Sequence, residues 1–156
     1  MPKRSKEDTE ITIQTIMDAV VDQILTLGYD KMSYTTLSKQ TGISRTGISH
    51  HFPKKQDFAT ALDGRIFRLF VEKLDLDNGM AGFSKSWVAA LEDNSDEKFK
   101  ATLRLLFHHI ASSETTSEFA KRGIDRLYGL CLERFGDESQ KELEWLLGKS
   151  LISLVR

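Results

Sequence analysis

The chain has 156 residues, enough for one domain or two small ones. Its 40% hydrophobic and 29% charged residues are typical of a folded globular protein and exclude a disordered chain. No apolar run approaches the roughly 18 residues of a membrane span, and the N-terminus lacks the apolar core of a signal peptide. One cysteine, Cys131, excludes an intrachain disulfide, so we expect a cytoplasmic protein.

A net charge of −1 is unusual for a DNA-binding protein, but the charge is unevenly distributed. Residues 1–55 hold eight Lys and Arg against six Asp and Glu, whereas residues 56–156 hold fourteen against seventeen. Seven of the eight basic side chains of the first part form a local footprint of the kind that contacts nucleic acid. They are Lys3, Arg4, Lys6, Lys39, Arg45, Lys54 and Lys55.

Apolar residues at helical spacing predict a first helix over 9–27, followed by two short helices. Ser33 can cap the first short helix, and Gly42 supplies the positive φ that a helix C-cap needs. Ser44 can cap the second, over 45–51. Two helices joined by a short glycine-containing turn are typical of a helix-turn-helix motif, whose second helix enters the DNA major groove.

The outward face of that second helix offers short polar side chains that suit close approach to base edges, and an Arg that can pair with guanine. These residues are Arg45, Thr46, Gly47, Ser49 and His50. Gly47 costs a helix roughly 1 kcal/mol relative to Ala, a loss that is better tolerated where another surface comes very near. That surface is DNA or, in the alternative interpretation, the first helix.

Lys54 and Lys55 open a further helix, where positive charges oppose the helix dipole. The conflict disappears if the lysines and the helix N-terminus clamp a DNA phosphate. Alternatively, they are a solvated surface pair that Asp57 compensates. We expect this helix to run over 54–76 and to belong to both halves of the protein.

The segment from about Ile11 to Leu62 resembles the TetR/AcrR (tetracycline-repressor-like) family of bacterial transcription regulators. The positions that match the family's pattern are Gly28, Tyr29, Gly42, Ile43, Ser44, Ile48, His51, Phe52, Lys55, Asp57 and Phe58. Ser49 departs from it, because a Tyr that touches the DNA backbone is usual there. Gly47 also departs, since Thr, Ser or Ala is common. These differences concern the contacts with DNA, not the presence of the motif.

The resemblance implies a homodimeric, sequence-specific repressor that binds double-stranded DNA at a near-palindromic operator. Some residues would then hold phosphates and others would face bases. The expected DNA-binding residues are Ser33, Thr35, Ser44, Arg45, Thr46, Gly47, Ser49, His50, His51, Lys54 and Lys55.

Helical patterns and the near absence of strand signals predict an all-α fold. We expect a three-helix DNA-binding domain over 1–53, joined by the long helix to a regulatory and dimerisation domain over 54–156. The later helices are expected over 83–91, from Asp96 to 112, from Thr115 or Thr116 to 135, and over 137–155. The last two carry broad apolar faces, which either bury within one chain or, as the resemblance implies, pair with a second copy.

Aromatic and apolar residues of the second half are either simple core or the lining of a cavity for a small hydrophobic ligand. The resemblance favours a cavity. The residues expected to line it are Phe67, Phe70, Phe83, Trp87, Phe99, Leu103, Phe107 and His108.

Other chemistry finds little support in the sequence. His108 and His109 point about 100° apart on a helix and have no ligand set at metal spacing. No nucleophile elbow, P-loop or dinucleotide glycine pattern occurs. We therefore expect no metal, no cofactor, no catalytic residue and no membrane contact. The alternative function is a helical protein–protein interaction module whose helix-turn-helix does not bind DNA.

Overall fold

A computed structural model describes residues 5–111 and 118–156, which form helices and no strands. The predicted all-α fold is confirmed. Lys3 and Arg4 of the basic footprint, and the helix start at Thr115 or Thr116, lie outside the described residues. The chain forms two compact units, Met1–Leu62 and Asp63–Arg156, called here the N-terminal and C-terminal units.

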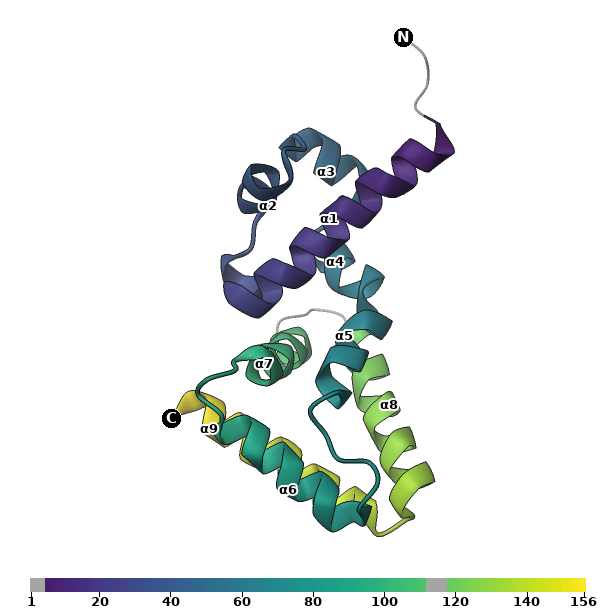
Figure 1. The fold of residues 1–156 in the computed structure, drawn as a ribbon, viewed down its shortest axis with the longest axis vertical. Helices are drawn as coiled ribbons and strands as arrows, with labels where there is room; N and C mark the ends of the chain where they lie inside the picture. The colour runs from purple at the N-terminus through teal and green to yellow at the C-terminus, as the bar shows by residue number, and fades with distance from the viewer. Residues whose placement is uncertain (1–4, 112–117) are drawn as a thin grey trace. The chain divides into compact units, whose positions relative to one another are not determined.

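The N-terminal unit packs a long helix against three short ones (Figure 1). Its elements are α1 (Lys6–Thr26), the 3-10 turn η1 (Tyr29–Lys31), α2 (Tyr34–Thr41), α3 (Arg45–His51) and α4 (Gln56–Ala61). α1 begins three residues before the predicted start because the Ser5 side chain accepts a hydrogen bond from the Asp8 amide. The centre of this unit is apolar: Ile16, Val20, Ile24, Met32, Leu37, Ile48 and Phe58 are buried.

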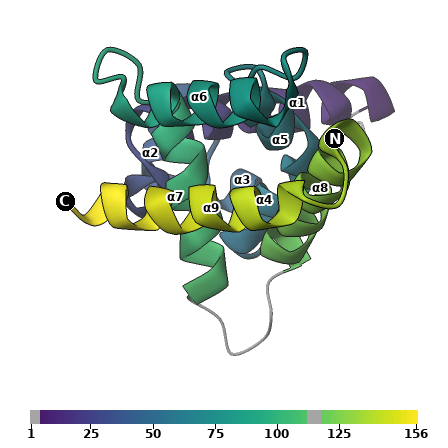
Figure 2. The same ribbon diagram turned by 90° about the horizontal axis from the view of Figure 1, so that it is seen from below.

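The C-terminal unit contains five helices in its described part. They are α5 (Asp63–Val71), α6 (Gly79–Glu92), α7 (Lys98–Ala111), α8 (Glu118–Phe135) and α9 (Ser139–Val155). α6 and α9 run alongside each other, and α7 crosses the pair on one side (Figures 1 and 2). Their apolar faces meet in one core, in which Phe70 stacks on Phe99 with ring centroids 4.6 Å apart.

The single helix predicted over 54–76 is wrong. It is two helices, because Leu62 leaves helical geometry at φ −101° and ψ 6° between α4 and α5. α5 also ends early, at Val71. Beyond it, the Asp75 amide donates to Ser86 Oγ at 2.8 Å, and the Asp75 carboxylate accepts the amides of Asp77 and Asn78. These bonds hold the chain in a turn that leads into α6.

Candidate nucleic-acid interface and ligand cavity

The helix-turn-helix forms as its caps predict. The Ser33 and Thr36 side chains each accept a hydrogen bond from the other's backbone N–H, which makes a capping box at the start of α2. Gly42 ends α2 at φ 75°, a left-handed conformation that favours glycine. Ser44 Oγ then accepts the Gly47 amide at 3.0 Å and starts α3. All three predicted caps are confirmed.

Two contacts fix α2 and α3 as one body. Leu37 of α2 and Ile48 of α3 are fully buried. The Tyr34 hydroxyl donates to the Phe52 carbonyl oxygen at 2.6 Å, which ties the start of α2 to the end of α3. The angle between the two helices therefore depends on both an apolar anchor and a polar one.

α2 is also fixed to α1 by a polar network. Gln23 is only 3% exposed. Its Nε2 donates to the Thr36 carbonyl oxygen at 3.1 Å and to Gln40 Oε1 at 2.8 Å. Gln40 Nε2 donates in turn to Asp22 Oδ2 at 3.1 Å. These bonds satisfy the buried amide and set the register of α2 along α1.

The outward face of α3 is accessible. Arg45, Thr46 and His50 are exposed, as is Thr35 at the start of α2. Ser49 is half-buried, and its hydroxyl donates to the Thr46 carbonyl oxygen at 3.1 Å. Of the side chains predicted to face bases, Ser49 is therefore engaged with its own helix.

A groove of about 740 Å³ lies beside this face. It is lined by Gly42, Ile43, Ser44, Thr46, Gly47, His50 and His51 together with Thr9 and Thr12. Thr9 and Thr12 were not predicted, because they precede the motif by more than twenty residues and only the packing of α1 brings them near. The groove therefore joins α1, the turn after α2 and α3 on one surface.

Gly47 is tightly surrounded, but not by the first helix. A Cβ at this position would lie 3.1 Å from Ile43 Cγ2 and 3.1 Å from Ser44 Oγ. Both neighbours belong to the turn that precedes α3. Close packing against α1 is thus not what makes the site small, and the alternative given above for Gly47 is wrong.

Lys54 and Lys55 differ in their surroundings. Lys54 is exposed, and its backbone amide donates to Asp57 Oδ2 at 2.9 Å. Lys55 Nζ lies over the Tyr29 ring, 4.4 Å from its centroid. Partial burial lowers the pKa of Lys55, and burial raises the pKa of Tyr29 to about 12. Asp57 therefore takes the amide at this helix start, while the two ammonium groups provide positive charge.

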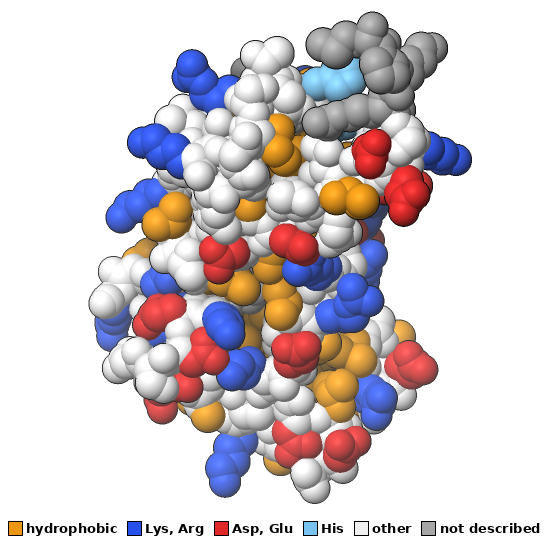
Figure 3. Space-filling view, turned by 45° about the horizontal axis from the view of Figure 1, so that its top comes forward, with side chains coloured by type: hydrophobic (Ala, Val, Ile, Leu, Met, Phe, Trp, Pro, Cys, Tyr) orange, Lys and Arg blue, Asp and Glu red, His pale blue; other side chains and the backbone are white. Residues whose placement is uncertain are grey.

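Charges of both signs cover the face drawn in Figure 3, where Lys and Arg side chains are interspersed with Asp and Glu. This distribution agrees with the net charge of −1.

The residues predicted to line a ligand cavity fall into three groups. Phe67, Phe70 and Leu103 do line a cavity in the C-terminal unit. Phe83, Trp87 and Phe99 are fully buried and pack on one another and on Phe70 in the core. Phe107 and His108 are half-buried on α7, outside that lining.

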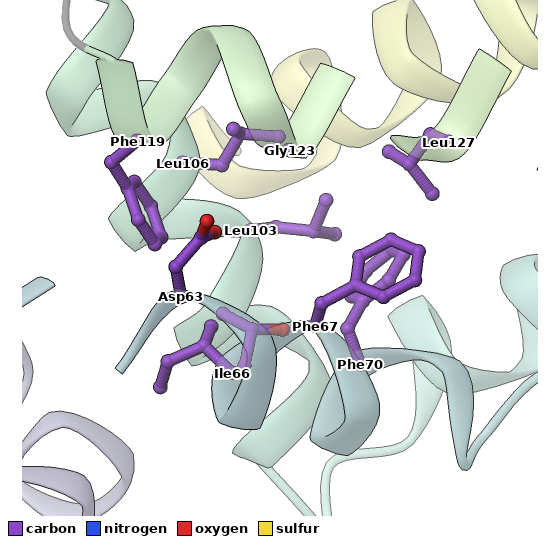
Figure 4. Close-up of a pocket in the computed structure, with 10 residues that line it drawn as sticks. Asp63, Ile66, Phe67, Phe70, Leu103, Leu106, Phe119, Gly123 and Leu127 are labelled. Atoms are coloured by element: carbon purple, nitrogen blue, oxygen red, sulfur yellow. The ribbon is translucent and has the colours of Figure 1, made fainter. Parts of the chain in front are cut away.

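This cavity has a volume of about 40 Å³, and its mostly apolar lining includes one acidic side chain (Figure 4). Its other lining residues are Asp63, Ile66, Thr102, Leu106, Phe119, Gly123 and Leu127. The Asp63 carboxylate points into it between Phe119 and Leu103. Asp63 was not among the predicted lining residues, because in the sequence it is one acidic residue within the helix predicted over 54–76.

Asp63 is held by two arginines of α8. Its Oδ1 lies 3.0 Å from Arg126 Nη1, and its Oδ2 lies 3.7 Å from Arg122 Nη1. The Arg126 guanidinium lies over the Phe67 ring, 5.7 Å from its centroid. These contacts tie the first residue of α5 to α8.

α9 has two apolar sides. Leu143, Leu146 and Ser150 face the core, and the buried Trp87 indole N–H donates to Ser150 Oγ at 2.7 Å. The opposite side carries Trp145, Ile152 and Val155, which are 54%, 56% and 79% exposed. With Gly148 these residues repeat at intervals of three, four and three, which forms one apolar stripe along a helix.

Two negative findings concern the part of the chain that the structure describes. None of its helices is long and apolar enough to cross a membrane. Within the same residues, no group of three or more His, Cys, Asp or Glu side chains is placed to hold a metal ion.

Comparison with known proteins identifies the family. No curated protein matches the chain. A family model described as "Tetracycline repressor LuxT C-terminal domain" matches residues 63–154. The match covers more than half of the chain, and the helix-turn-helix precedes it. The chain belongs to the tetracycline-repressor-like family of transcriptional regulators.

Proposed function

We propose that the protein is a homodimeric repressor that binds a near-palindromic DNA operator and releases it when a small hydrophobic ligand binds. The observation that supports this most is the exposed polar face of α3, with Arg45, Thr46 and His50 beside a groove. In a helix-turn-helix, this face enters the major groove. Arg45 would read a base edge there, because its guanidinium can pair bidentately with guanine.

Phosphate contacts would come from the edges of the same surface. We expect them from the side chains of Ser33, Thr35, Ser44 and His51, with those of Lys54 and Lys55. Ser33 and Ser44 accept capping bonds, so each hydroxyl still has a proton to donate to a phosphate. Such contacts position the protein but carry no sequence information.

Dimerisation would use the exposed stripe of α9, together with Leu132 of α8, which is also exposed. Four large apolar side chains on neighbouring helices are costly to leave in water, and a second copy would cover them. Two copies would place two α3 helices about 34–36 Å apart, or a multiple of that, on DNA.

Selection of bound DNA from random sequence, with the full chain, tests this function. We expect enrichment of inverted half-sites at one fixed spacing. A repressor's response further requires that a ligand bind the DNA-competent and DNA-free states with different affinity.

The alternative is a helical protein–protein interaction module without DNA binding. It is favoured by α3 itself, where Gly47 has no side chain and the Ser49 hydroxyl donates to Thr46. Failure to enrich any sequence at low salt, where phosphate contacts are strongest, would support this alternative and contradict the repressor.

A further inference from the structure

The cavity between α5, α7 and α8 contains a buried acceptor without a donor. Asp63 is 6% exposed, and its Oδ2 has no hydrogen-bond partner among the described residues. Arg122 Nη1 lies 3.7 Å from this oxygen, which is beyond hydrogen-bond length, and Arg126 Nη1 lies 3.0 Å from the other carboxylate oxygen, Oδ1. A buried carboxylate oxygen without a donor is costly, so the site favours any molecule that supplies one.

From this juxtaposition we propose that the cavity binds a small, neutral, apolar molecule bearing a hydroxyl group, which donates its hydrogen bond to Asp63 Oδ2. The inference deepens the ligand response proposed above and rests on it for its regulatory meaning. It names the chemical class of the ligand and the atom that recognises it.

The rest of the cavity lining favours an apolar ligand. Aromatic and aliphatic side chains line it, among them Phe67, Phe70, Leu103 and Phe119. Thr102 is the other polar side chain of the lining, and its hydroxyl proton is already given to the Phe99 carbonyl oxygen at 2.7 Å. A ligand therefore meets one strong acceptor on an otherwise apolar surface.

Charge argues for a neutral ligand. Asp63 already has two guanidinium groups beside it, so an ammonium group would add a third positive charge around one carboxylate. A carboxylate ligand would place a second acid against Asp63 Oδ2, where like charges repel. A hydroxyl supplies the donor and adds no charge.

Size limits the ligand further. The volume of about 40 Å³ is roughly three times the 10–15 Å³ that one water needs on the same measure, so the cavity accommodates a hydroxyl group with a few carbon atoms. A single ring requires the ends of the Leu103 and Leu106 side chains to move. Because these are flexible groups, small monocyclic or short-chain alcohols are the class that fits.

Phenol and toluene test the inference, because they have nearly the same size and differ in the hydroxyl group. Each is titrated into the full-length protein without DNA, and binding is followed by NMR of the Leu103 and Leu106 methyl groups. We expect phenol to bind about tenfold more tightly than toluene, in line with a hydrogen bond to a charged acceptor. Equal affinities, or shifts confined to other methyl groups, would overturn the inference.

Two variants distinguish the contribution of the Asp63 acceptor from that of the cavity volume. Asp63→Asn keeps the shape but weakens the acceptor, so the preference for phenol should fall severalfold. Gly123→Ala adds a Cβ that would lie 3.2 Å from Leu106 Cδ1 and narrows the cavity. It should weaken phenol and toluene by the same factor and keep the preference. If Asp63→Asn does not fold, the phenol–toluene comparison and Gly123→Ala still decide the outcome.

Benzylamine and benzoate complete the test. Both should bind more weakly than phenol, and tighter binding of either would overturn the choice of a neutral ligand. Since no DNA is present, these titrations stand apart from the operator selection. If phenol binds at Asp63 but the selection enriches no DNA sequence, the ligand site stands and only the proposed repressor function is contradicted.

Discussion

Thr36 Oγ1 donates a hydrogen bond of 2.6 Å to Gln23 Oε1 and thereby joins the capping box of α2 to the core of α1. The same Thr36 hydroxyl oxygen accepts the Ser33 amide at 2.9 Å. The cap that starts α2 is therefore continuous with the network that fixes α2 on α1. A change at Gln23 should affect the placement of the whole helix-turn-helix.

We expect Gln23→Leu to destabilise the protein by about 1–3 kcal/mol, because the half-buried Thr36 loses both the donor to its carbonyl oxygen and the acceptor of its hydroxyl. Urea unfolding followed by circular dichroism measures the loss. Gln14→Leu is the matched control on the same helix, since Gln14 is exposed and its side chain donates to Asp18 at the helix surface. Equal losses in the two variants would contradict the role given to Gln23.

Substitutions of Lys55 and Arg45 should affect DNA binding in different ways. Lys55→Ala should weaken binding to all sequences alike and reduce the slope of log affinity against log salt by about one unit. Arg45→Ala should relax the preference at one operator position, at a cost of about 1–3 kcal/mol on the preferred base. Binding to the selected operator and to single-base variants, over a range of salt, separates the two effects.

Lys85→Ala serves as the control for lost charge, because Lys85 is an exposed residue of α6 in the other unit. It should leave both affinity and salt slope unchanged. Unchanged operator binding in both Lys55→Ala and Arg45→Ala would refute the assignment of the DNA-binding surface.

The local features of the fold were predictable from sequence, whereas the features that depend on distant contacts were not. Ser33, Gly42 and Ser44 act through bonds to residues within four positions, so their residue types alone indicate the caps. The break at Leu62 stands beside Asp63, which is paired with arginines of α8 some sixty residues later. No helical pattern over 54–76 contains that information.

The same distinction explains the ligand cavity. Aromatic side chains such as those of Phe83, Trp87 and Phe99 are typical of a cavity lining, but here their rings pack against one another in the core. Asp63 was absent from the prediction, because an acidic residue within a helix predicted over 54–76 is ordinarily solvated. Its proposed role rests on its burial and on the missing donor at Oδ2, which only the structure gives.

Ile152→Asp should convert the protein from dimer to monomer, because it places a charge in the middle of the exposed stripe of α9. Sedimentation equilibrium at micromolar concentration measures the change. Ile110→Asp is the matched control, since Ile110 of α7 is 54% exposed, nearly the same as Ile152 at 56%. A wild-type monomer, or the same response in both variants, would exclude this interface.

Ser150→Ala should cost about 1–3 kcal/mol of stability, because it leaves the buried Trp87 indole N–H without an acceptor. Ser153→Ala, at an exposed position of the same helix, should cost almost nothing. Trp87→Phe removes the donor as well as part of the ring. Once this substitution is present, adding Ser150→Ala should cost less than it does alone, and additive losses would contradict the bond's contribution.

Cys131 provides a test of pH dependence. Burial raises the pKa of its thiol from 9.0 to about 11. Between these values the folded state holds a proton that the unfolded state releases, so the free energy of unfolding falls as pH rises from 9 to 11. Below pH 9 the thiol is neutral in both states and contributes no slope.

Cys131→Ala removes this titration and should make the decline in stability between pH 9 and 11 shallower than in the wild type. Urea unfolding at several pH values compares the slopes, so the loss of the sulfur itself cancels. A thiol reagent should react slowly with the folded wild type at pH 8, at a rate set by opening of the core, because Cys131 is fully buried. Parallel pH profiles together with rapid labelling would show that the thiol is accessible and that its pKa is ordinary.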